Sequence, residues 1–282
     1  MKAYVINLVR SPERRAHMQR ELHKTGMEYE FIEAVDGTEC DLEDSSISSP
    51  ISLGRGLIQQ GAWRGARYWP GVLGCALSHL KVYRKILEDG AEVALVLEDD
   101  IILPADIHEL AEAVAAHMTT AEVALLQYHN LGANHGRALR LSRMTATQLP
   151  RSRVLAFPAE IADVACSGAY VVTREACELM ARLVLPVRVP ADDWSFYVAN
   201  YGLHGLRCVA PMPVGVDPTF HTTIPWSLKR LALPLLGHAL ARRRQAVMTE
   251  TELVDRRSDQ RYEQELVDRG PIDVTKSLLK FA

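Results

Sequence analysis

The stretch Val93-Ala94-Leu95-Val96-Leu97-Glu98-Asp99-Asp100 joins five consecutive apolar residues to three consecutive carboxylates. An unbroken apolar run of this length is typical of a strand that is buried on both faces, as in a parallel sheet covered by helices. In open α/β sheets, ligands bind just beyond the carboxyl ends of the strands. The stretch therefore predicts a central strand over 93–97 that ends at a polar site.

Strand and helix patterns alternate on both sides of this stretch. Ser11 and Pro12 are placed as N-cap and first residue of a helix that Gly26 ends. The alternation predicts an α/β fold with a mostly parallel central sheet. The expected strands are 3–8, 29–34, 93–97, 123–127 and 169–173, and further helices are expected over 72–87, 105–117 and 175–183. Between them, the Gly- and Ser-rich residues 36–70 predict a long loop, either a functional lid or a surface excursion.

Composition narrows the class of protein. The 282 residues suffice for one large α/β domain with an appendage or for two small domains, and 48% hydrophobic residues can fill a core. A formal net charge of −3 argues against a dedicated nucleic-acid binder. The five cysteines show no C-x-x-C pair, which favours free thiols in a reducing compartment. With no secretory pattern at the N-terminus and no apolar run of about 20 residues, we expect a cytoplasmic protein.

The acidic triplet is the first candidate site. Three adjacent carboxylates repel one another unless a cation compensates them. In extended backbone Glu98 and Asp100 point to the same side, so both can reach one Mn²⁺ or Mg²⁺ ion whose other positions suit diphosphate oxygens. The alternative is a solvated acidic turn after a strand.

Several motifs together carry a resemblance to a known family. They are Val5-Ile6-Asn7-Leu8 followed by Arg10, Ser11, Arg14 and Arg15, then Gly74-Cys75-Ala76-Leu77-Ser78-His79, Glu98-Asp99-Asp100, Gly168-Ala169-Tyr170-Val171-Val172, and the region of Asp193. In this order and spacing, the chain resembles the family 25 glycosyltransferases, the lipooligosaccharide galactosyltransferase group, over roughly residues 1–225. The resemblance implies a GT-A-type fold, a UDP-sugar donor, often UDP-galactose, a divalent metal such as Mn²⁺, and inversion at the anomeric carbon.

Candidate donor-binding residues follow the first two expected strands. Asn7, Leu8, Arg10 and Arg14 lie where a strand end meets a helix start, a place that binds anions or a nucleotide base. Asp36 follows the second strand, where its carboxylate could hold a ribose hydroxyl or only shape the Asp36-Gly37 turn. The family resemblance adds Ser78, His79 and Asp99 to the donor site.

Candidate residues for the acceptor side lie further along the chain. An inverting transfer needs a base that takes the proton of the acceptor hydroxyl. The resemblance falls best on Asp193. Its neighbours Trp194 and Phe196 also suit an acceptor site, because sugars stack on aromatic faces. Asp192 is the second candidate, with helix capping as its alternative role. His221 is a weaker candidate ligand for the metal or the diphosphate.

The sequence predicts a catalytic domain over 1–225 and a basic, helical tail over 226–282. Residues 228–244 contain two Lys or Arg clusters and no acidic residue around an apolar stretch. Such a segment could dock on an anionic membrane, at the inner face of the cytoplasmic membrane, or pack on the catalytic domain.

The leading functional hypothesis is hexose transfer from a UDP-sugar onto a saccharide or glycolipid acceptor of the bacterial surface. Two alternatives use the same residues differently. A metal-dependent nucleotidyltransferase or phosphoesterase would release pyrophosphate or phosphate in place of UDP. A non-catalytic saccharide-binding protein would function without Asp100 and Asp193.

Overall fold

The computed structural model of the chain describes residues 1–41, 44, 46–47, 69–131, 139–220 and 252–254. Most of the expected loop over 36–70, most of the expected tail, and His221 therefore lie outside the described residues. No helix in the described part of the chain is both long and apolar enough to cross a membrane.

An eight-stranded mixed sheet forms the centre of the molecule, in the order β2-β1-β3-β11-β5-β12-β9-β8. Its strands are β1 (Ala3–Asn7), β2 (Tyr29–Glu33), β3 (Val93–Leu97), β5 (Glu122–Leu125), β8 (Thr147–Leu149), β9 (Arg153–Ala156), β11 (Ala169–Thr173) and β12 (Gly205–Ala210). Only β11 and β9 run against the other strands of this sheet, since each is antiparallel to both of its neighbours. The predicted α/β class with a mostly parallel central sheet is confirmed.

Three two-stranded sheets surround the central one. They pair β6 (His129–Asn130) with β10 (Val164–Ala165), β4 (Ile101–Ile102) with β13 (Gly215–Val216), and β7 (Arg140–Ser142) with β14 (Glu252–Val254). Strands of two or three residues are too short to show a periodicity, so the sequence did not predict them. Within the predicted helical tail, the only described residues, 252–254, are extended rather than helical.

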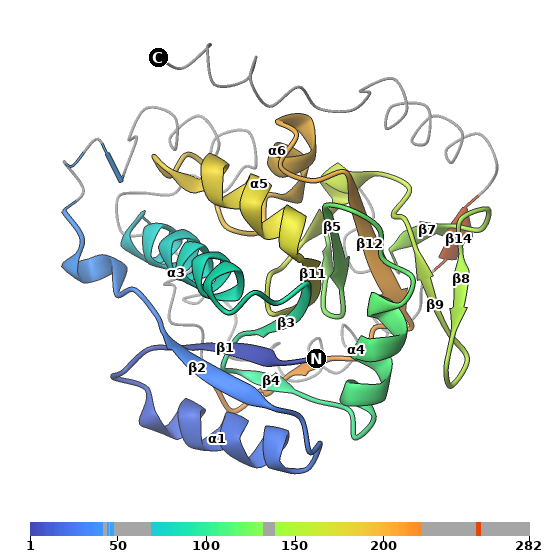
Figure 1. Cartoon of the computed structure of the whole chain (residues 1–282), viewed down its shortest axis with the longest axis horizontal. Helices are drawn as coiled ribbons and strands as arrows, with labels where there is room; N and C mark the ends of the chain where they lie inside the picture. The colour runs from blue at the N-terminus through green and yellow to red at the C-terminus, as the bar shows by residue number, and fades with distance from the viewer. Residues whose placement is uncertain (42–43, 45, 48–68, 132–138, 221–251, 255–282) are drawn as a thin grey trace, which may run out of the picture.

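Helices cover both faces of the central sheet (Figure 1). They are α1 (Pro12–His23), α3 (Trp69–Glu88), α4 (Ile107–Ala115), α5 (Arg174–Val184) and α6 (Trp194–Ala199), with short 3₁₀ turns η1 (Gly37–Glu39) and η2 (Ile161–Asp163). One core cluster joins the sheet to α3, α5 and α6, and the other joins it to α1 and α4.

The position of strand β3 between the two core clusters explains why its sequence is apolar throughout. Ala94 and Val96 belong to the cluster under α3 and α5, whereas Leu95 and Leu97 belong to the cluster under α1 and α4, and all four are fully buried. Its bounds agree with the predicted strand over 93–97. Ser11 occupies the predicted N-cap position of α1, but its side chain makes no capping hydrogen bond.

Two glycines bring helix α3 against the loop that follows β2. A Cβ on Gly37 would overlap the Pro70 carbonyl group, and a Cβ on Gly74 would lie 2.6 Å from the Val35 oxygen and 2.7 Å from the Gly37 nitrogen. Backbone therefore packs on backbone here. This contact positions the first turns of α3 beside the carboxyl end of β2.

We expect Gly74→Ala to lower the free energy of unfolding by about 1–3 kcal/mol, because the new methyl group has no room. The sign is diagnostic, since Gly→Ala inside an unconstrained helix stabilises by about 1 kcal/mol. Gly215→Ala is the matched control: apart from its chain neighbours, no described residue has an atom within 4 Å of the added Cβ, so its effect should stay within about 0.5 kcal/mol. Urea denaturation followed by circular dichroism measures both, and a stabilised Gly74→Ala protein would contradict the contact.

Candidate active site

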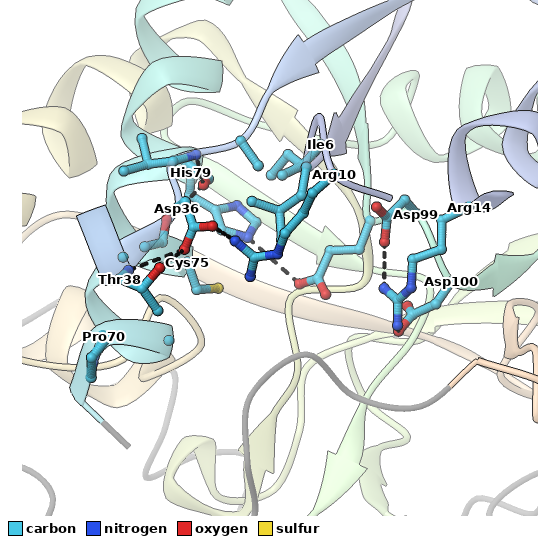
Figure 2. Close-up of a pocket in the computed structure, with 18 residues that line it drawn as sticks. Ile6, Arg10, Arg14, Asp36, Thr38, Pro70, Cys75, His79, Asp99 and Asp100 are labelled. Atoms are coloured by element: carbon cyan, nitrogen blue, oxygen red, sulfur yellow. Dashed lines mark hydrogen bonds and ion pairs between the residues drawn. The ribbon is translucent and has the colours of Figure 1, made fainter. Parts of the chain in front are cut away.

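A cavity of about 200 Å³ opens at the carboxyl ends of β1, β2 and β3 (Figure 2). Its walls are the segments that follow these three strands and the first turns of α3. Of the residues predicted from the sequence, nine line it: Leu8, Arg10, Arg14, Asp36, Ser78, His79, Glu98, Asp99 and Asp100. Residues far apart in the chain thus meet where an α/β sheet binds its ligands.

Asp36 has two roles in the cavity wall. Its Oδ1 accepts hydrogen bonds from the Thr38 backbone nitrogen at 3.1 Å and the Thr38 hydroxyl at 2.7 Å, so it shapes the turn as one interpretation predicted. Its Oδ2 forms an ion pair with Arg10, visible in Figure 2. The Arg10 side chain is about half exposed. A ribose hydroxyl that binds Asp36 would therefore have to share this carboxylate with Arg10.

Ser78 holds the α3 wall to the β2 wall. Its hydroxyl donates to the Gly74 carbonyl at 2.6 Å and accepts from the Val35 backbone nitrogen at 2.8 Å. Both bonds are internal to the protein, and the residue is 2% exposed. Ser78 fixes the distance between the two walls.

Arg14 joins helix α1 to the acidic triplet. Its guanidinium lies 2.5 Å from Asp99 and 3.2 Å from Asp100, and the residue is only 6% exposed. Asn7 lies behind the cavity and donates from its amide to Asp99 at 2.7 Å. The Arg14 guanidinium also stands 5.3 Å from the centre of the Phe220 ring.

The triplet itself is not extended. Strand β3 ends at Leu97, and Asp99 and Asp100 form a turn. The geometric premise of the metal prediction, that Glu98 and Asp100 alternate along extended backbone, is therefore wrong, because the strand ends before the triplet and the chain turns at Asp99 and Asp100. Both carboxylates nevertheless line the same cavity.

Glu98 has partners of its own on the opposite wall. The Ser167 hydroxyl donates to its Oε1 at 2.7 Å, and the His79 Nε2 lies 3.6 Å from the same oxygen. Burial alone would raise the pKa of Glu98, but the His79 imidazole and the Ser167 hydroxyl outweigh it and hold the pKa below its ordinary value. Glu98 is thus an ionised carboxylate at neutral pH.

The pKa values of Asp99 and Asp100 are raised, in contrast to that of Glu98. Burial raises the pKa of Asp99, against the opposing effects of Asn7 and Arg14. Burial, together with the neighbouring Glu98 charge, raises the pKa of Asp100 to about 6, although Arg14 opposes the shift. The lining carries four carboxylates and two guanidinium groups, which leaves a formal charge of −2 when His79 is neutral. Oxygen donors with excess negative charge fit a hard divalent cation.

The two acceptor-side aspartates are placed differently from the prediction. Asp193 is the N-cap of α6: its Oδ1 accepts from the Phe196 nitrogen at 3.1 Å and from the Ser195 hydroxyl at 2.7 Å. The capping role considered for Asp192 is therefore wrong. The Asp192 carboxylate instead accepts from the Cys166 nitrogen at 3.0 Å. Burial raises the pKa of Asp192, and the Glu98 charge adds to the shift.

Three residues near Glu98 were not predicted from the sequence. Ser167 contacts Glu98 directly, Tyr170 accepts or donates a 2.7 Å hydrogen bond at the His79 Nδ1, and His129 lies near enough to Asp192 and Glu98 for both charges to oppose the lowering of its pKa by burial. Tyr170 lies within a quoted motif, which could have singled it out. His129 belongs to the two-residue strand β6 and Ser167 lies just after the two-residue strand β10, so no local pattern marks them.

The chain is similar to known proteins over the segment that forms the cavity. The model of glycosyltransferase family 25 (LPS biosynthesis protein) matches residues 1–195, more than two thirds of the chain. The chain belongs to glycosyltransferase family 25. The matched segment contains all the residues that line the cavity, as well as Asp192 and Asp193. The cavity therefore lies in the part of the chain that the family model covers.

Individual relatives align over part of their length. A putative glycosyltransferase of Acanthamoeba polyphaga mimivirus is 41% identical over 36% of this chain and 29% of its own. Procollagen galactosyltransferase 1 of Danio rerio is 32% identical over 36% of this chain and 16% of its own. A putative glycosyltransferase of Haemophilus influenzae is 32% identical over 39% of this chain and 36% of its own. The chain thus aligns with about a third or less of these relatives.

A solved glycosyltransferase that acts in glycosylation of the major capsid of PBCV-1 overlaps 71% of this chain and 75% of its own. The identity is 10% and the TM-score 0.29. At this TM-score the likeness adds nothing to the description of the fold.

The raised pKa of Asp100 predicts a stability effect with a definite pH dependence. Between its unfolded pKa near 4 and its folded pKa of about 6, the folded state retains a proton that the unfolded state has lost. Above pH 6 the ionised group, next to Glu98 and Asp99 and opposite Arg14, lowers the stability. Asp100→Asn should therefore raise the free energy of unfolding by about 1–2 kcal/mol at pH 7, and the gain should vanish near pH 4.

Asp106→Asn is the control of opposite sign. A hydrogen bond from Arg153 lowers the pKa of Asp106, so this carboxylate stabilises the fold above its unfolded pKa and loses that effect as the pH falls. Asp106→Asn should destabilise at pH 7 and less so at pH 4. Denaturant titrations at both pH values measure the two variants without metal; a destabilised Asp100→Asn at pH 7 would contradict the assigned charge balance.

Proposed function

We propose that this chain transfers a hexose from a UDP-sugar onto a saccharide acceptor with inversion at the anomeric carbon, and that the donor is UDP-galactose. The cavity at the ends of β1, β2 and β3 is the observation that carries the proposal. Its lining includes the half-exposed Arg10 guanidinium, the Asp36 carboxylate and the acidic triplet. These groups match the nucleotide portion of the donor, namely base, ribose and, through a bound cation, diphosphate.

The cofactor of the proposed reaction is Mn²⁺ or Mg²⁺, held by Glu98 and Asp100. When bound, such an ion neutralises the charge that develops on the departing nucleoside diphosphate. Arg14 keeps Asp99 and Asp100 in place, and Ser167 orients Glu98. His221, the third predicted ligand, lies outside the described residues.

The choice of sugar and acceptor rests on the names of a relative and of the family. The zebrafish relative is named a procollagen galactosyltransferase, and the family description refers to LPS biosynthesis. We therefore propose galactose as the sugar and a lipooligosaccharide or lipopolysaccharide as the acceptor. A cytoplasmic enzyme that works on such a glycolipid would lie at the inner face of the membrane, and the basic residues 228–244 would provide the contact.

We assign the general base to Asp192. Asp193, the first choice from the sequence, already accepts two hydrogen bonds through Oδ1 as the cap of α6. Asp192 is not among the residues that line the cavity, but it accepts one hydrogen bond, from the Cys166 nitrogen, and lies near enough to Glu98 for the two charges to interact. Its raised pKa makes it a stronger base than an ordinary carboxylate. In this assignment Asp192 takes the proton of the acceptor hydroxyl as that oxygen bonds to the anomeric carbon and UDP departs.

The test of the proposed function is a panel of UDP-sugars incubated with Mn²⁺, with and without truncated lipooligosaccharide. We expect UDP release that depends on acceptor and is largest with UDP-galactose. Release of pyrophosphate or inorganic phosphate would instead support a nucleotidyltransferase or phosphoesterase. Absence of turnover, with saccharide still bound, would support the non-catalytic alternative.

We expect Asp100→Ala to abolish Mn²⁺-dependent binding of UDP-galactose while the protein stays folded, because the ion loses one of its two carboxylates. Isothermal titration calorimetry with and without Mn²⁺ measures the loss. Glu109→Ala removes an exposed carboxylate from the first turn of α4 and serves as the control. Donor affinity that survives in folded Asp100→Ala would refute the metal assignment.

We expect Asp192→Asn to lower turnover by about 10²–10⁴-fold, the usual contribution of positioned proton transfer, with little change in donor affinity. Asp193→Asn is the matched control, because asparagine caps a helix as well as aspartate does. Steady-state kinetics on both variants separates the two carboxylates. An inactive Asp193→Asn beside an active Asp192→Asn would return the base to Asp193.

A further inference from the structure

We propose that Cys75, His79 and Glu98 form a second metal site, for a thiophilic divalent cation of which Zn²⁺ is the type. The site lies in the inner wall of the cavity and differs in ligand chemistry from the oxygen site of Glu98 and Asp100. Its three ligands are sulfur, nitrogen and oxygen, the set that zinc prefers and that Mg²⁺ does not.

The spacing of the three ligands fits one ion. Cys75 and His79 are four residues apart on helix α3, so their side chains project from the same face. The Cys75 sulfur, a ring nitrogen of His79 and a carboxylate oxygen of Glu98 all lie within 4.8 Å of one another. Among the described residues, this is the group of three or more such side chains that can hold an ion.

The distance between His79 and Glu98 leaves room for a cation between the two side chains. The two atoms, Nε2 and Oε1, are 3.6 Å apart, which is too long for an N–H···O bond. Ligands at zinc distances of about 2.0–2.2 Å, on tetrahedral directions, stand about 3.4 Å apart. The gap therefore has the width that a tetrahedral ion needs.

The His79 ring is buried and has a nitrogen without a partner. The residue is 1% exposed, and its Nε2 has no hydrogen-bond partner within the described part of the chain. Its Nδ1 lies 2.7 Å from the Tyr170 hydroxyl, which in turn lies 3.4 Å from the Tyr83 hydroxyl. A cation between Nε2 and the Glu98 carboxylate would take the place of the imidazole proton that lowers the Glu98 pKa, and the Nδ1–H would then donate to the Tyr170 hydroxyl.

The surroundings complete the site. Ser167 donates to the same Glu98 oxygen and so orients the carboxylate, as outer-shell groups do around metal ligands. Cys75 is half-buried and lines the cavity together with His79 and Glu98, so an ion can enter from the cavity. The excess negative charge of the lining favours its entry. If the proposed function holds, an ion here takes Glu98 from the donor metal, so Zn²⁺ would compete with Mn²⁺.

The test is binding of Co²⁺, a spectroscopic substitute for Zn²⁺, to the full chain without nucleotide sugar. We expect one equivalent to produce a thiolate-to-cobalt charge-transfer band that Zn²⁺ displaces. Cys75→Ser should lose the band, whereas Cys166→Ser should retain it, because Cys166 is also half-buried and lies close by but is not part of the ligand set. A band that persists in Cys75→Ser, or is absent from the wild type, would overturn the proposal.

Tyr170→Phe provides a second measurement that leaves every ligand in place. Loss of the hydroxyl that orients His79 should weaken Co²⁺ binding about 10–100-fold while the band keeps its position. Circular dichroism monitors folding of each variant, and unchanged affinity in folded Tyr170→Phe would also count against the site. Because no donor or acceptor is present, failure of this test leaves the transferase proposal untouched, and an inactive enzyme leaves this one untouched.

Discussion

The buried ion pair between Arg14 and Asp99 is the contact on which the rest of the site depends. It joins the first helix to the turn after β3, and the Asn7 amide binds the same carboxylate from β1. Breaking a buried pair leaves one charge without compensation and costs about 3–5 kcal/mol. The same guanidinium reaches Asp100 and packs on Phe220, so one side chain positions the triplet from one face. These contacts hold Asp99 and Asp100 at one side of the cavity in the absence of a ligand.

Much of the central fold could be predicted from the sequence, because burial on both faces leaves an unmistakable pattern. The β3 segment is apolar at every position and its neighbours β1 and β11 are similar, so these strands were found within a residue of their ends. Strands β8, β9 and β12 were missed. Their residues include Gln148, Arg153 and Arg207, whose polar groups interrupt the apolar pattern, and Arg207 is held by an ion pair to Glu122 that only the folded chain reveals.

The sequence could predict which residues line the cavity, but not which side chains pair with one another there. Local spacing places Arg10, Arg14 and the triplet near strand ends, and all of them line the cavity. It could not show that Arg10 pairs with Asp36, nor that Ser167 binds Glu98, since these partners are 26 and 69 positions apart. Asp192 and Asp193 illustrate a finer limit: adjacent carboxylates look alike in sequence, and only the backbone direction at the start of α6 decides which one caps the helix.

Cys166 adopts φ of +98°, a left-handed conformation that is strained for a residue other than glycine. Hydrogen bonds hold the Cys166 backbone on both sides of its Cα atom: the nitrogen donates to Asp192 and the carbonyl accepts from the Trp194 indole at 3.1 Å. The next residue, Ser167, binds Glu98. Asp192 and Glu98 are thus connected through the adjacent residues Cys166 and Ser167. Any energetic coupling that this loop transmits between a ligand at Glu98 and a ligand at Asp192 would have to be reciprocal, because linkage acts equally in both directions.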